Sequence, residues 1–565
     1  MKRILSILSA FLVLTVTMSL LLPLSSCSKK SDDSNKPTDG SNTSADVSTN
    51  TVTSVQATTQ TTTTAPAPDT PVVFTYDFTG KTTKLPTPTP KKLPAWKGFN
   101  LLNLFQVDSM TPFDENEFKM ISAWGFDFVR IPMDYRCWAT SGDWNVMDEQ
   151  VMEMIDKAVE YGIKYDVHVC LNFHRAPGYT VATPPEETDL WTQPEPQEAF
   201  ADMWAKFAAR YKNVPNEYLS FDLVNEPGDM DESIYAAVMK KAADAIWAQD
   251  PKRLIIADGL SWGMTPSNMI KDLGIAQATR GYQPMTLTHY LAEWIDGADS
   301  YPIPTWPTVA IPQYLYSFGK SDLRSIYSIT HDFNEAYNLD INVGTVSNQA
   351  RLIVKADGVE IYNHLFESGP GTGDWTTSVY VDEWKIYQNI FSKDYRVNIP
   401  AGTKLLTLEV TDGDWMTVND MKFASVSGTG KAFSLTPNTP DWGVKIPSIT
   451  IDADGNIVLE GADIHNGNWL KNTYLTPWIN LINSGGGAMV GEWGSYDKTP
   501  HDVVLRWMED NLNNFKEAGL GWALWNFNGS FGILNSGRDD VDYEDFNGYQ
   551  LDRQMLDLLQ KYLDY

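Results

Sequence analysis

The feature that most constrains the fold of this 565-residue chain is an alternation of short apolar segments with amphipathic ones, which begins after Lys91. Such an alternation is typical of a parallel sheet built from βα units. We predict eight strands, at 97–103, 126–133, 164–174, 218–226, 253–258, 285–290, 488–494 and 521–527. Helical stretches follow them, for example at 148–161, 501–517 and 551–562. Eight βα units predict the α/β fold class and, as the simplest closed solution, a (β/α)8 TIM barrel.

A long segment separates the sixth and seventh predicted strands, although one loop and one helix would join them. Residues 476–484 can supply that helix, with Thr476 as its N-cap and Pro477 at its first position. Roughly 130 residues are therefore extra to the barrel unit. They alternate apolar and polar residues and contain Asp-Gly turns, as in ARLIVKADGVEIY and KLLTLEVTDG, which predicts an inserted all-β sandwich. We place the sandwich at 313–440, between barrel parts at 91–312 and 441–565.

The N-terminal segment reads as a targeting signal. A positively charged start is followed by an apolar run at 4–24 and by Leu-Ser-Ser-Cys, which ends at Cys27. This pattern predicts a lipoprotein signal peptide at 1–26 and lipidation of Cys27; the run is also long enough to span a bilayer, so an uncleaved anchor is the alternative. Either way we expect an exported protein, at the cell surface or anchored to a membrane. Residues 27–90 are rich in Ser and Thr and predict a flexible linker.

Charge and cysteine content exclude several classes of partner. The net charge of -29 is spread without long acidic blocks, which argues against nucleic acid and other polyanions but leaves neutral polymers open. The seven His are scattered without ligand spacing, so we expect no metal and no other cofactor. Beyond Cys27, a disulfide would have to join Cys137 to Cys170, but a place inside a strand favours Cys170 as a small core residue. We expect a monomer.

Aromatic residues are frequent, with 20 Trp and 25 Tyr. Sugar rings stack on flat aromatic faces, but a large core and crowded loops account for most of these residues. In the predicted sandwich, a sugar-binding platform and a structural wall beside a cleft are equally open roles for Trp375, Trp384, Tyr387 and Trp415. In predicted βα loops, the candidate sugar platforms, each with loop packing as the alternative, are Trp138, Trp191, Trp262, Trp294 and Trp493.

Two glutamates each end an apolar run that has the length and composition of a buried strand: Glu226 in YLSFDLVNEPG and Glu492 in GAMVGEWGS. The active groups of such barrels lie at the C-terminal ends of the strands. Two carboxyl groups at one rim can protonate and attack a glycosidic bond. Further polar or aromatic residues predicted near strand ends are Arg130, His174, Asn225, His289 and Trp525. Each residue alone could be a buried group whose hydrogen bonds are made within the core, but together they indicate one site.

These residues resemble the pattern of glycoside hydrolase family 5, in the clan whose acid and nucleophile lie at the ends of the fourth and seventh barrel strands. Arg, His, Asn-Glu, His, Glu and Trp follow in the family's order on strands two, three, four, six, seven and eight. The resemblance covers 95–310 and 440–565, and FHRAPGYT suggests a cellulase-like subgroup. It implies that Glu226 is the acid/base, Glu492 the nucleophile and Asn225 the partner of the sugar 2-hydroxyl. The other substrate-binding residues that it implies are Arg130, His174, His289, Tyr290 and Trp525.

Two positions depart from the family pattern. The family usually has a Tyr two residues after the sixth-strand His, and this Tyr hydrogen-bonds the nucleophile. Here Leu291 stands at that place and Tyr290 lies beside His289, so Tyr290 or another group supplies the hydrogen bond. On the third strand, a pair of His common in related cellulases appears as His174-Arg175, which makes Arg175 a candidate subsite residue.

The chemistry of the pair predicts a double displacement. Retention needs carboxyl groups about 5 to 5.5 Å apart. Arg130 would keep Glu492 ionised, and the negative Glu492 would raise the pKa of Glu226 until esterification removes that charge. We therefore predict a retaining endo-β-1,4-glucanase acting on β-glucan or glucomannan. The alternatives are a β-mannanase, an exo-acting β-glucosidase-type hydrolase and, in another class, a non-catalytic glycan-binding lipoprotein of the cell surface.

Overall fold

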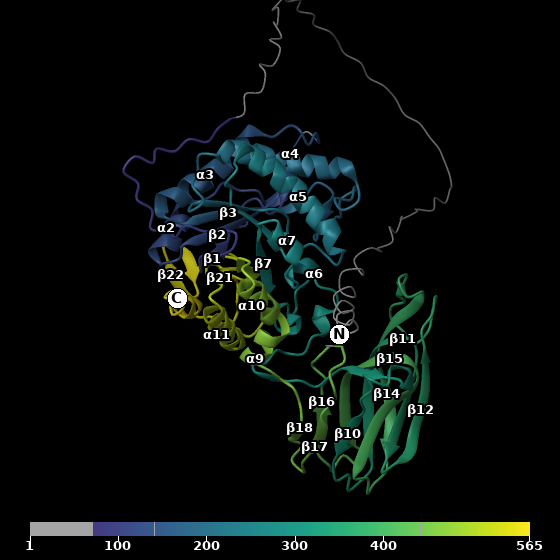
Figure 1. Ribbon diagram of the computed structural model, residues 1–565. Helices are drawn as coiled ribbons and strands as arrows, with labels where there is room; N and C mark the ends of the chain where they lie inside the picture. Colours follow the sequence, from purple (N-terminus) through teal and green to yellow (C-terminus); the bar gives the residue numbers. More distant parts are fainter. Residues whose placement is uncertain (1–71, 141, 441) are drawn as a thin grey trace, which may run out of the picture.

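The computed structural model describes residues 72–140, 142–440 and 442–565 (Figure 1). The predicted signal peptide at 1–26, Cys27 and most of the predicted linker lie outside the described residues. The linker prediction is wrong for 72–90, because Phe74 and Leu85 are buried and the Phe74 N–H donates to the Arg210 carbonyl at 2.9 Å. In the part of the chain that is described, we find no helix with the length and apolar character that crossing a membrane requires.

Eight parallel strands close a barrel in the described chain, which confirms the predicted fold class. The order around it is β2-β1-β21-β20-β7-β6-β5-β3, and a β2–β3 pairing closes the circle. The barrel strands are β1 (Lys97–Asn100), β2 (Phe128–Asp134), β3 (His168–Ala176), β5 (Leu219–Asp222), β6 (Ile255–Asp258), β7 (Ala276–Gly281), β20 (Ala488–Trp493) and β21 (Gly521–Leu524). The short β4 (Tyr179–Thr180) pairs with β3 in antiparallel fashion. All eight barrel strands are buried along their whole length, as expected of a parallel sheet covered by helices.

Helices surround the barrel strands in Figure 1. The longer ones are α2 (Glu115–Ala123), α3 (Glu149–Tyr165), α4 (Pro194–Tyr211), α5 (Glu232–Gln249), α10 (Thr476–Asn483), α11 (His501–Ala518) and α12 (Arg553–Gln560). Shorter turns are α6 (Leu260–Gly263), α7 (Asn268–Asp272), α8 (Met285–Thr288), α9 (Gly467–Leu470), η2 (Val107–Ser109), η3 (Tyr135–Cys137), η4 (Ala298–Ser300), η5 (Phe318–Lys320) and the π-helical η6 (Lys471–Leu475). Helix α3 shows why they form: Asp148 caps the N-terminus by accepting from the Gln150 N–H, and Ile155 and Val159 face the core.

The predicted sixth strand is wrong. Residues 285–290 form helix α8 and the turn after it, and the sixth barrel strand is β7, Ala276–Gly281. The sequence of β7, AQATRG, has one β-branched residue and ends in Gly, so its intrinsic strand preference is weak. Its place is fixed instead by pairing with β6 and β20 on either side. The correction moves the end of this strand from Tyr290 to Gly281.

The chain between β7 and β20 forms a ten-stranded sheet that folds on itself around a second hydrophobic core. Its strands are β9 (Tyr314–Tyr316), β10 (Tyr327–Thr330), β11 (Tyr337–Ala356), β12 (Val359–Glu367), β13 (Tyr380–Val381), β14 (Ile386–Ile399), β15 (Leu405–Ser425), β16 (Phe433–Leu435), β17 (Ser448–Ile451) and β18 (Ile457–Glu460). The long strands β11 and β15 pair with each other across register shifts, while β11 changes its other neighbour from β14 to β12. Because of these irregularities, one long strand can pair in one sheet of the sandwich along part of its length and in the other sheet along the rest.

The insertion extends further than predicted. Strands β17 and β18 belong to its sheet, although they follow the expected boundary at 440. The helix expected at 476–484 is also longer, because α9, η6 and α10 run on from one another from Gly467 to Asn483. Thr476 is therefore not its N-cap, and the wider π-helical turn lies just before Pro477. Two small antiparallel pairs complete the fold: β8 (Thr308–Val309) with β19 (Ile464–His465), and β22 (Glu544–Phe546) with β23 (Tyr549–Leu551).

Candidate active site

Strands β2, β5, β6, β7 and β20 bring the predicted glutamates together with charged partners. Glu492 lies in β20, and Arg130 lies in β2. Glu226 follows β5 by a few residues and has a positive φ of 46°, a backbone conformation that non-glycine residues adopt at a cost of about 1–3 kcal/mol. The contacts around each carboxyl group explain how this arrangement is held.

Glu492 is buried, accepts hydrogen bonds from Arg130 and Tyr282, and forms a further ion pair with Arg280. Arg130 Nη1 lies 2.6 Å and Arg280 Nη2 3.2 Å from its Oε1, and the Tyr282 hydroxyl lies 3.1 Å from its Oε2. Burial and the neighbouring carboxylates of Glu492 and Glu226 raise the pKa of Tyr282 well above its ordinary value, so the hydroxyl keeps its proton and donates it. Two cations and a phenol therefore surround the carboxyl group of Glu492.

Glu226 is held through both its backbone and its carboxyl group. Its N–H donates to Asp258 Oδ2 at 2.8 Å, and its carbonyl accepts from the Tyr179 hydroxyl at 2.6 Å. Its Oε1 accepts from Arg280 Nε at 2.9 Å. Burial, the negative charge of Glu492 and that of Asp258 outweigh Arg280 and raise the pKa of Glu226 to about 7. A carboxyl group with that pKa can both give and accept a proton near neutral pH.

Arg130 is fixed by partners behind the two glutamates. Its Nε donates to Asp222 Oδ2 at 2.8 Å, and its Nη2 donates to Asn225 Oδ1 at 2.9 Å. Asn100 accepts from Nη1 at 3.2 Å. The Asn225 side-chain amide nitrogen is buried and has no hydrogen-bond partner within the described ranges. A buried donor without a partner is costly unless a ligand satisfies it.

Arg280 and Tyr282 were not predicted, because the sixth strand was placed one segment too late. With β7 as the sixth strand, Tyr282 follows Arg280 by two residues and hydrogen-bonds the nucleophile candidate. This is the place of the family Tyr, so Arg280 stands where the family has its sixth-strand His. The spacing Arg-Gly-Tyr directly before Gln-Pro was the signal in the sequence.

His289 and Tyr290 lie elsewhere than predicted. The His289 ring packs against Tyr282, with centroids 5.2 Å apart, and its Nδ1 is 2.9 Å from the Thr288 hydroxyl. Tyr290 is half-buried and does not supply the hydrogen bond to Glu492, which comes from Tyr282. The turn after α8 thus brings His289 to the aromatic surroundings of the site and leaves Tyr290 outside the contacts of the carboxyl pair.

An aromatic wall stands beside the carboxyl groups. The His174 ring stacks near Trp525, with centroids 5.7 Å apart, and Phe105 packs against both rings. Burial and then the charges of Arg130, Arg280 and Arg175 lower the pKa of His174 well below its ordinary value, so its imidazole is neutral. Arg175 does not line this wall: it is buried and donates to Glu186 and to the Pro184 carbonyl, which makes it an anchor of the 182–186 loop.

The tryptophans expected in loops divide by exposure. Trp138 and Trp493 are fully buried and belong to the barrel core, whereas 56% of Trp294 is exposed, between His289 and Tyr496. Trp191 and Trp262 are half-buried. Cys137 and Cys170 are both buried and free, so no disulfide joins them. The described residues contain no group of three or more His, Cys, Asp or Glu side chains arranged to hold a metal ion.

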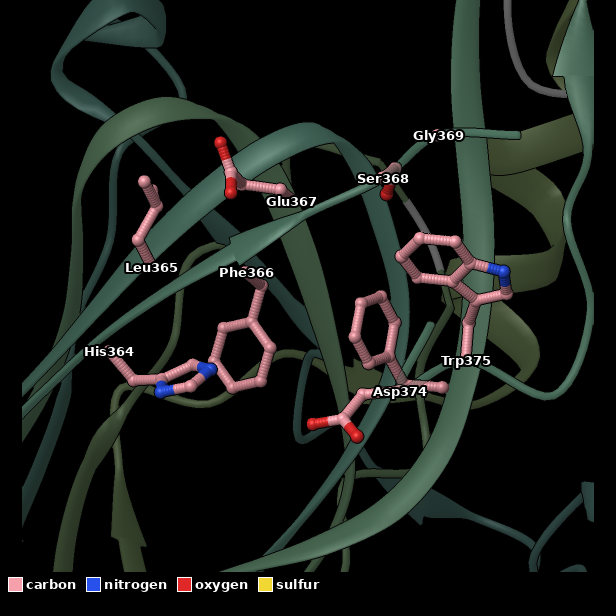
Figure 2. Close-up of a pocket in the computed structure, with 9 residues that line it drawn as sticks. His364, Leu365, Phe366, Glu367, Ser368, Gly369, Asp374 and Trp375 are labelled. Carbon is pink, nitrogen blue, oxygen red and sulfur yellow. The ribbon is translucent and has the colours of Figure 1, made fainter. Parts of the chain in front are cut away.

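A separate surface pocket of about 280 Å³ lies on the inserted sandwich (Figure 2). Its lining comes from the end of β12, from the loop that carries Asp374 and Trp375, and from Phe391 of β14. Figure 2 shows the Asp374 carboxylate beside the His364 and Phe366 rings, with the Trp375 indole on the other side. Trp415, predicted as part of a sugar platform, is instead buried against Tyr314 and Trp442.

Comparison with known proteins agrees with this geometry. Residues 88–281 match the family model "Cellulase (glycosyl hydrolase family 5)". Endoglucanase C of Acetivibrio thermocellus is 30% identical over 216 residues, which are 36% of this chain and 62% of that protein. Endoglucanase 3 of Fibrobacter succinogenes is 26% identical over 290 residues, 46% of this chain and 43% of that protein.

A crystal structure of a glycoside hydrolase is 26% identical, with a TM-score of 0.53, and covers 83% of this chain and 99% of its own. Of the two endoglucanases named above, the chain spans less than two thirds of the length: 62% of endoglucanase C and 43% of endoglucanase 3. The matched segment holds the first six barrel strands, with Arg130, Asn225, Glu226 and Arg280. By this match, residues 88–281 are similar to the cellulase domain of glycoside hydrolase family 5.

Proposed function

We propose that the protein is a retaining endo-β-1,4-glucanase that hydrolyses β-glucan by double displacement. One observation carries the proposal: Glu226 and Glu492 share the guanidinium of Arg280, while only Glu492 has the further support of Arg130 and Tyr282. The two environments push the carboxyl groups towards different protonation states, as the separation of acid from nucleophile requires. The names of the two similar endoglucanases support the substrate class.

In the first step, an ionised Glu492 oxygen attacks the anomeric carbon, and the bond to the leaving sugar oxygen breaks as Glu226 protonates it. The pKa of Glu226, raised to about 7, keeps a useful fraction of this group protonated at neutral pH. We assign the bond to the sugar 2-hydroxyl to the Asn225 amide nitrogen, because this donor is buried and has no partner in the described chain. Such a bond strengthens in the transition state.

In the second step, Glu226 accepts a proton from water as the water oxygen attacks the anomeric carbon and the ester bond to Glu492 breaks. Esterification has removed the charge of Glu492, which is one cause of the raised pKa of Glu226. The pKa of Glu226 therefore falls when it must act as a base. His174, Trp525 and Trp294 supply ring faces at the rim on which sugar units stack.

Product analysis tests this proposal. Wild type, Glu226→Gln and the exposed control Glu153→Gln are each incubated with carboxymethylcellulose, mixed-linkage glucan, xyloglucan, glucomannan and mannan. We expect one glucan class to lose viscosity quickly with wild type and with the control, and slowly or not at all with Glu226→Gln. Cleavage of mannan alone would indicate a mannanase. Release of short sugars without loss of viscosity would indicate exo action, and binding without cleavage would indicate a glycan-binding protein.

We further propose that the sandwich pocket of Figure 2 binds the polysaccharide. The half-buried Trp375 offers an aromatic edge, and the exposed carboxylates of Asp374 and Glu367 are acceptors for sugar hydroxyls. Pull-down on insoluble cellulose tests it: Trp375→Ala combined with Asp374→Asn should weaken retention, while the rate on a soluble substrate stays that of wild type. Unchanged retention would assign the sandwich a structural role.

A further inference from the structure

Arg280 bridges the two glutamates to which we assign the chemistry. Its Nε donates to Glu226 Oε1 at 2.9 Å, and its Nη2 lies 3.2 Å from Glu492 Oε1. Arg130, by contrast, contacts Glu492 but not Glu226. A guanidinium is planar, and its donors point in fixed directions. Because Arg280 is buried, it holds the two carboxylates in a fixed relation to each other.

Asp258 holds Arg280 from the other side. Its Oδ1 accepts from Arg280 Nη1 at 3.0 Å, and its Oδ2 accepts from Arg280 Nη2. The same Oδ2 accepts the backbone N–H of Glu226 at 2.8 Å, where φ is 46°. One fully buried carboxylate therefore positions both the guanidinium and the backbone of the acid/base.

We propose that Arg280, held in place by Asp258, is a positioning residue. Its guanidinium pairs with the negative charge on Glu492 and with the negative charge on Glu226 as the reaction moves this charge from one glutamate to the other. The proposal rests on the roles given to the two glutamates under the proposed function. Before the first step, Glu492 is negative and Glu226 holds a proton. After the step, Glu492 is a neutral ester, the leaving oxygen has the proton, and Glu226 is negative.

Both positions of the charge lie within hydrogen-bond reach of the same guanidinium, so Arg280 need not move when the charge does. A preorganised donor of this kind stabilises a developing charge without reorganisation. In the second step, the proton of the attacking water goes to Glu226, and the negative charge returns to Glu492 as the ester bond breaks. Arg280 therefore contacts whichever of the two glutamates carries the negative charge at each stage of the reaction.

The charged groups around Glu226 come from three barrel strands: Arg280 lies in β7, Asp258 in β6 and Glu492 in β20. The hydroxyls of Tyr179 and Tyr282 lie close by. Glu492 and Asp258 raise the pKa of Glu226, and Arg280 lowers it. Both tyrosines have a raised pKa and stay neutral. Removing Arg280 should therefore raise the pKa of Glu226, and removing the charge of Asp258 should lower it.

Profiles of kcat/KM against pH test the proposal on phenyl β-cellobioside, a substrate whose leaving group needs an acid. In Arg280→Gln the basic limb should move up by about one pH unit, and in Asp258→Asn it should move down. Arg280→Lys keeps the charge, so its basic limb should stay close to that of wild type. The control Lys240→Gln removes an exposed cation from α5 and should leave the limb in place.

A second readout separates this role from a structural one. With 2,4-dinitrophenyl β-cellobioside the leaving group needs no acid, and the second step limits the rate. Arg280→Gln should then lower kcat and KM together, because a glycosyl-enzyme whose base is poorly ionised accumulates. A structural role would lower the rate on both substrates alike and would leave the limb where it is in wild type; that result would overturn the proposal.

Folding is checked first by thermal unfolding. If Arg280→Gln does not fold, Asp258→Asn replaces it in the pH measurement, and the expected shift of the basic limb is then downwards. Arg280→Lys, which keeps the pair with Asp258, carries the second readout, since one ammonium cannot contact both glutamates as a guanidinium does. A wild type that cleaves no β-glycoside would refute the proposed function itself, whereas an active wild type with an unmoved limb in the variants would refute only the role of Arg280.

Discussion

Six buried or nearly buried charged residues set the protonation of the site. The carboxyl groups of Asp222, Asp258, Glu226 and Glu492 face the guanidinium groups of Arg130 and Arg280. Burial raises the pKa of both Asp222 and Glu226 to about 7, so these two groups compete for protons near neutral pH. With four acids and two cations, the site cannot be neutral unless protons remain on it. The excess of acids over cations in the cluster favours a proton on one of its carboxyl groups.

Tyr282 offers a direct test of the corrected strand register. Tyr282→Phe removes the hydroxyl that donates to Glu492 Oε2 at 3.1 Å. A hydrogen bond to a charged group contributes about 1.5–3 kcal/mol, so we expect kcat/KM to fall about 10-fold to 100-fold.

Tyr290→Phe is the matched control, because the hydroxyl that reaches Glu492 belongs to Tyr282. We expect its rate to fall several-fold less than that of Tyr282→Phe, measured on the same soluble substrate. A larger loss in Tyr290→Phe would mean that the predicted sixth strand was placed correctly from the sequence and that β7 is misassigned.

At the scale of strands and helices, the sequence predicted seven of the eight barrel strands near their observed places. Some of those strands are rich in β-branched or aromatic residues, as in FVRIPMD of β2 and IIAD of β6. Strand β7 has the sequence AQATRG, and its extended form depends on its two neighbours in the barrel. A preference that comes from tertiary pairing cannot be read from a single segment. Because this strand was predicted in the wrong place, neither Arg280 nor Tyr282 was predicted as a site residue.

Glu226 and Glu492 could be proposed as the catalytic pair because a charged residue at the end of an apolar strand stands out in a sequence. Asp222 and Asp258 also end apolar segments, but they lie behind Arg130 and Arg280. How each carboxylate is placed relative to the two arginines depends on the turns after β5 and β6. The positive φ of Glu226, 46°, is one such feature. Sequence alone could therefore name the acids but not rank them.

Close packing of two barrel strands gives a prediction about stability. Gly98 of β1 pairs with Phe128 of β2, and a Cβ atom at Gly98 would lie 1.7 Å from the Phe128 carbonyl oxygen. Gly98→Ala should therefore force the strands apart and lower the free energy of unfolding by at least about 1–3 kcal/mol. Urea denaturation measures the loss. The control Gly369→Ala meets nothing within 4 Å and should keep the midpoint of wild type; equal midpoints for the two variants would contradict the close approach.

At the scale of the whole molecule, barrel and sandwich have separate hydrophobic cores. The chain leaves the barrel and returns to it through a narrow neck, where Val309 pairs with Ile464 and the Ala310 N–H donates to the Asp463 carbonyl at 2.8 Å. Figure 1 shows the sheet of the insertion, in green, as a body beside the barrel. Because the two ends of the insertion are neighbours, its removal need not open the barrel.

Excision of the insertion tests this independence. Replacing residues 311–462 by a short Gly-Ser turn should leave a barrel that folds cooperatively and cleaves soluble glucan at a rate within a few-fold of wild type. Thermal unfolding and rate measurements on soluble and insoluble glucan are compared between the two forms. Loss on the insoluble form alone would support a binding sandwich, whereas loss on both forms would show that the sandwich supports the barrel.

Lipidation of Cys27 is a prediction for the intact protein in a bacterial host. Metabolic labelling with an alkyne-bearing fatty acid should mark the wild-type protein, and the protein should sediment with membranes. Cys27→Ser should lose the label and move to the aqueous fraction, because a lipid chain supplies about 0.8 kcal/mol of membrane affinity for each buried CH₂ group. Retention of Cys27→Ser in the membrane would point instead to an uncleaved anchor.

The most direct test of the central claim is to trap the glycosyl-enzyme. The protein is incubated with 2,4-dinitrophenyl 2-deoxy-2-fluoro-β-cellobioside, digested and analysed by mass spectrometry. We expect one added 2-fluorocellobiosyl group, on the peptide that contains Glu492, and protection from labelling by cellobiose. Labelling of a different residue would contradict the assignment of the nucleophile, and turnover of β-glucan with inversion and no label would contradict the double displacement.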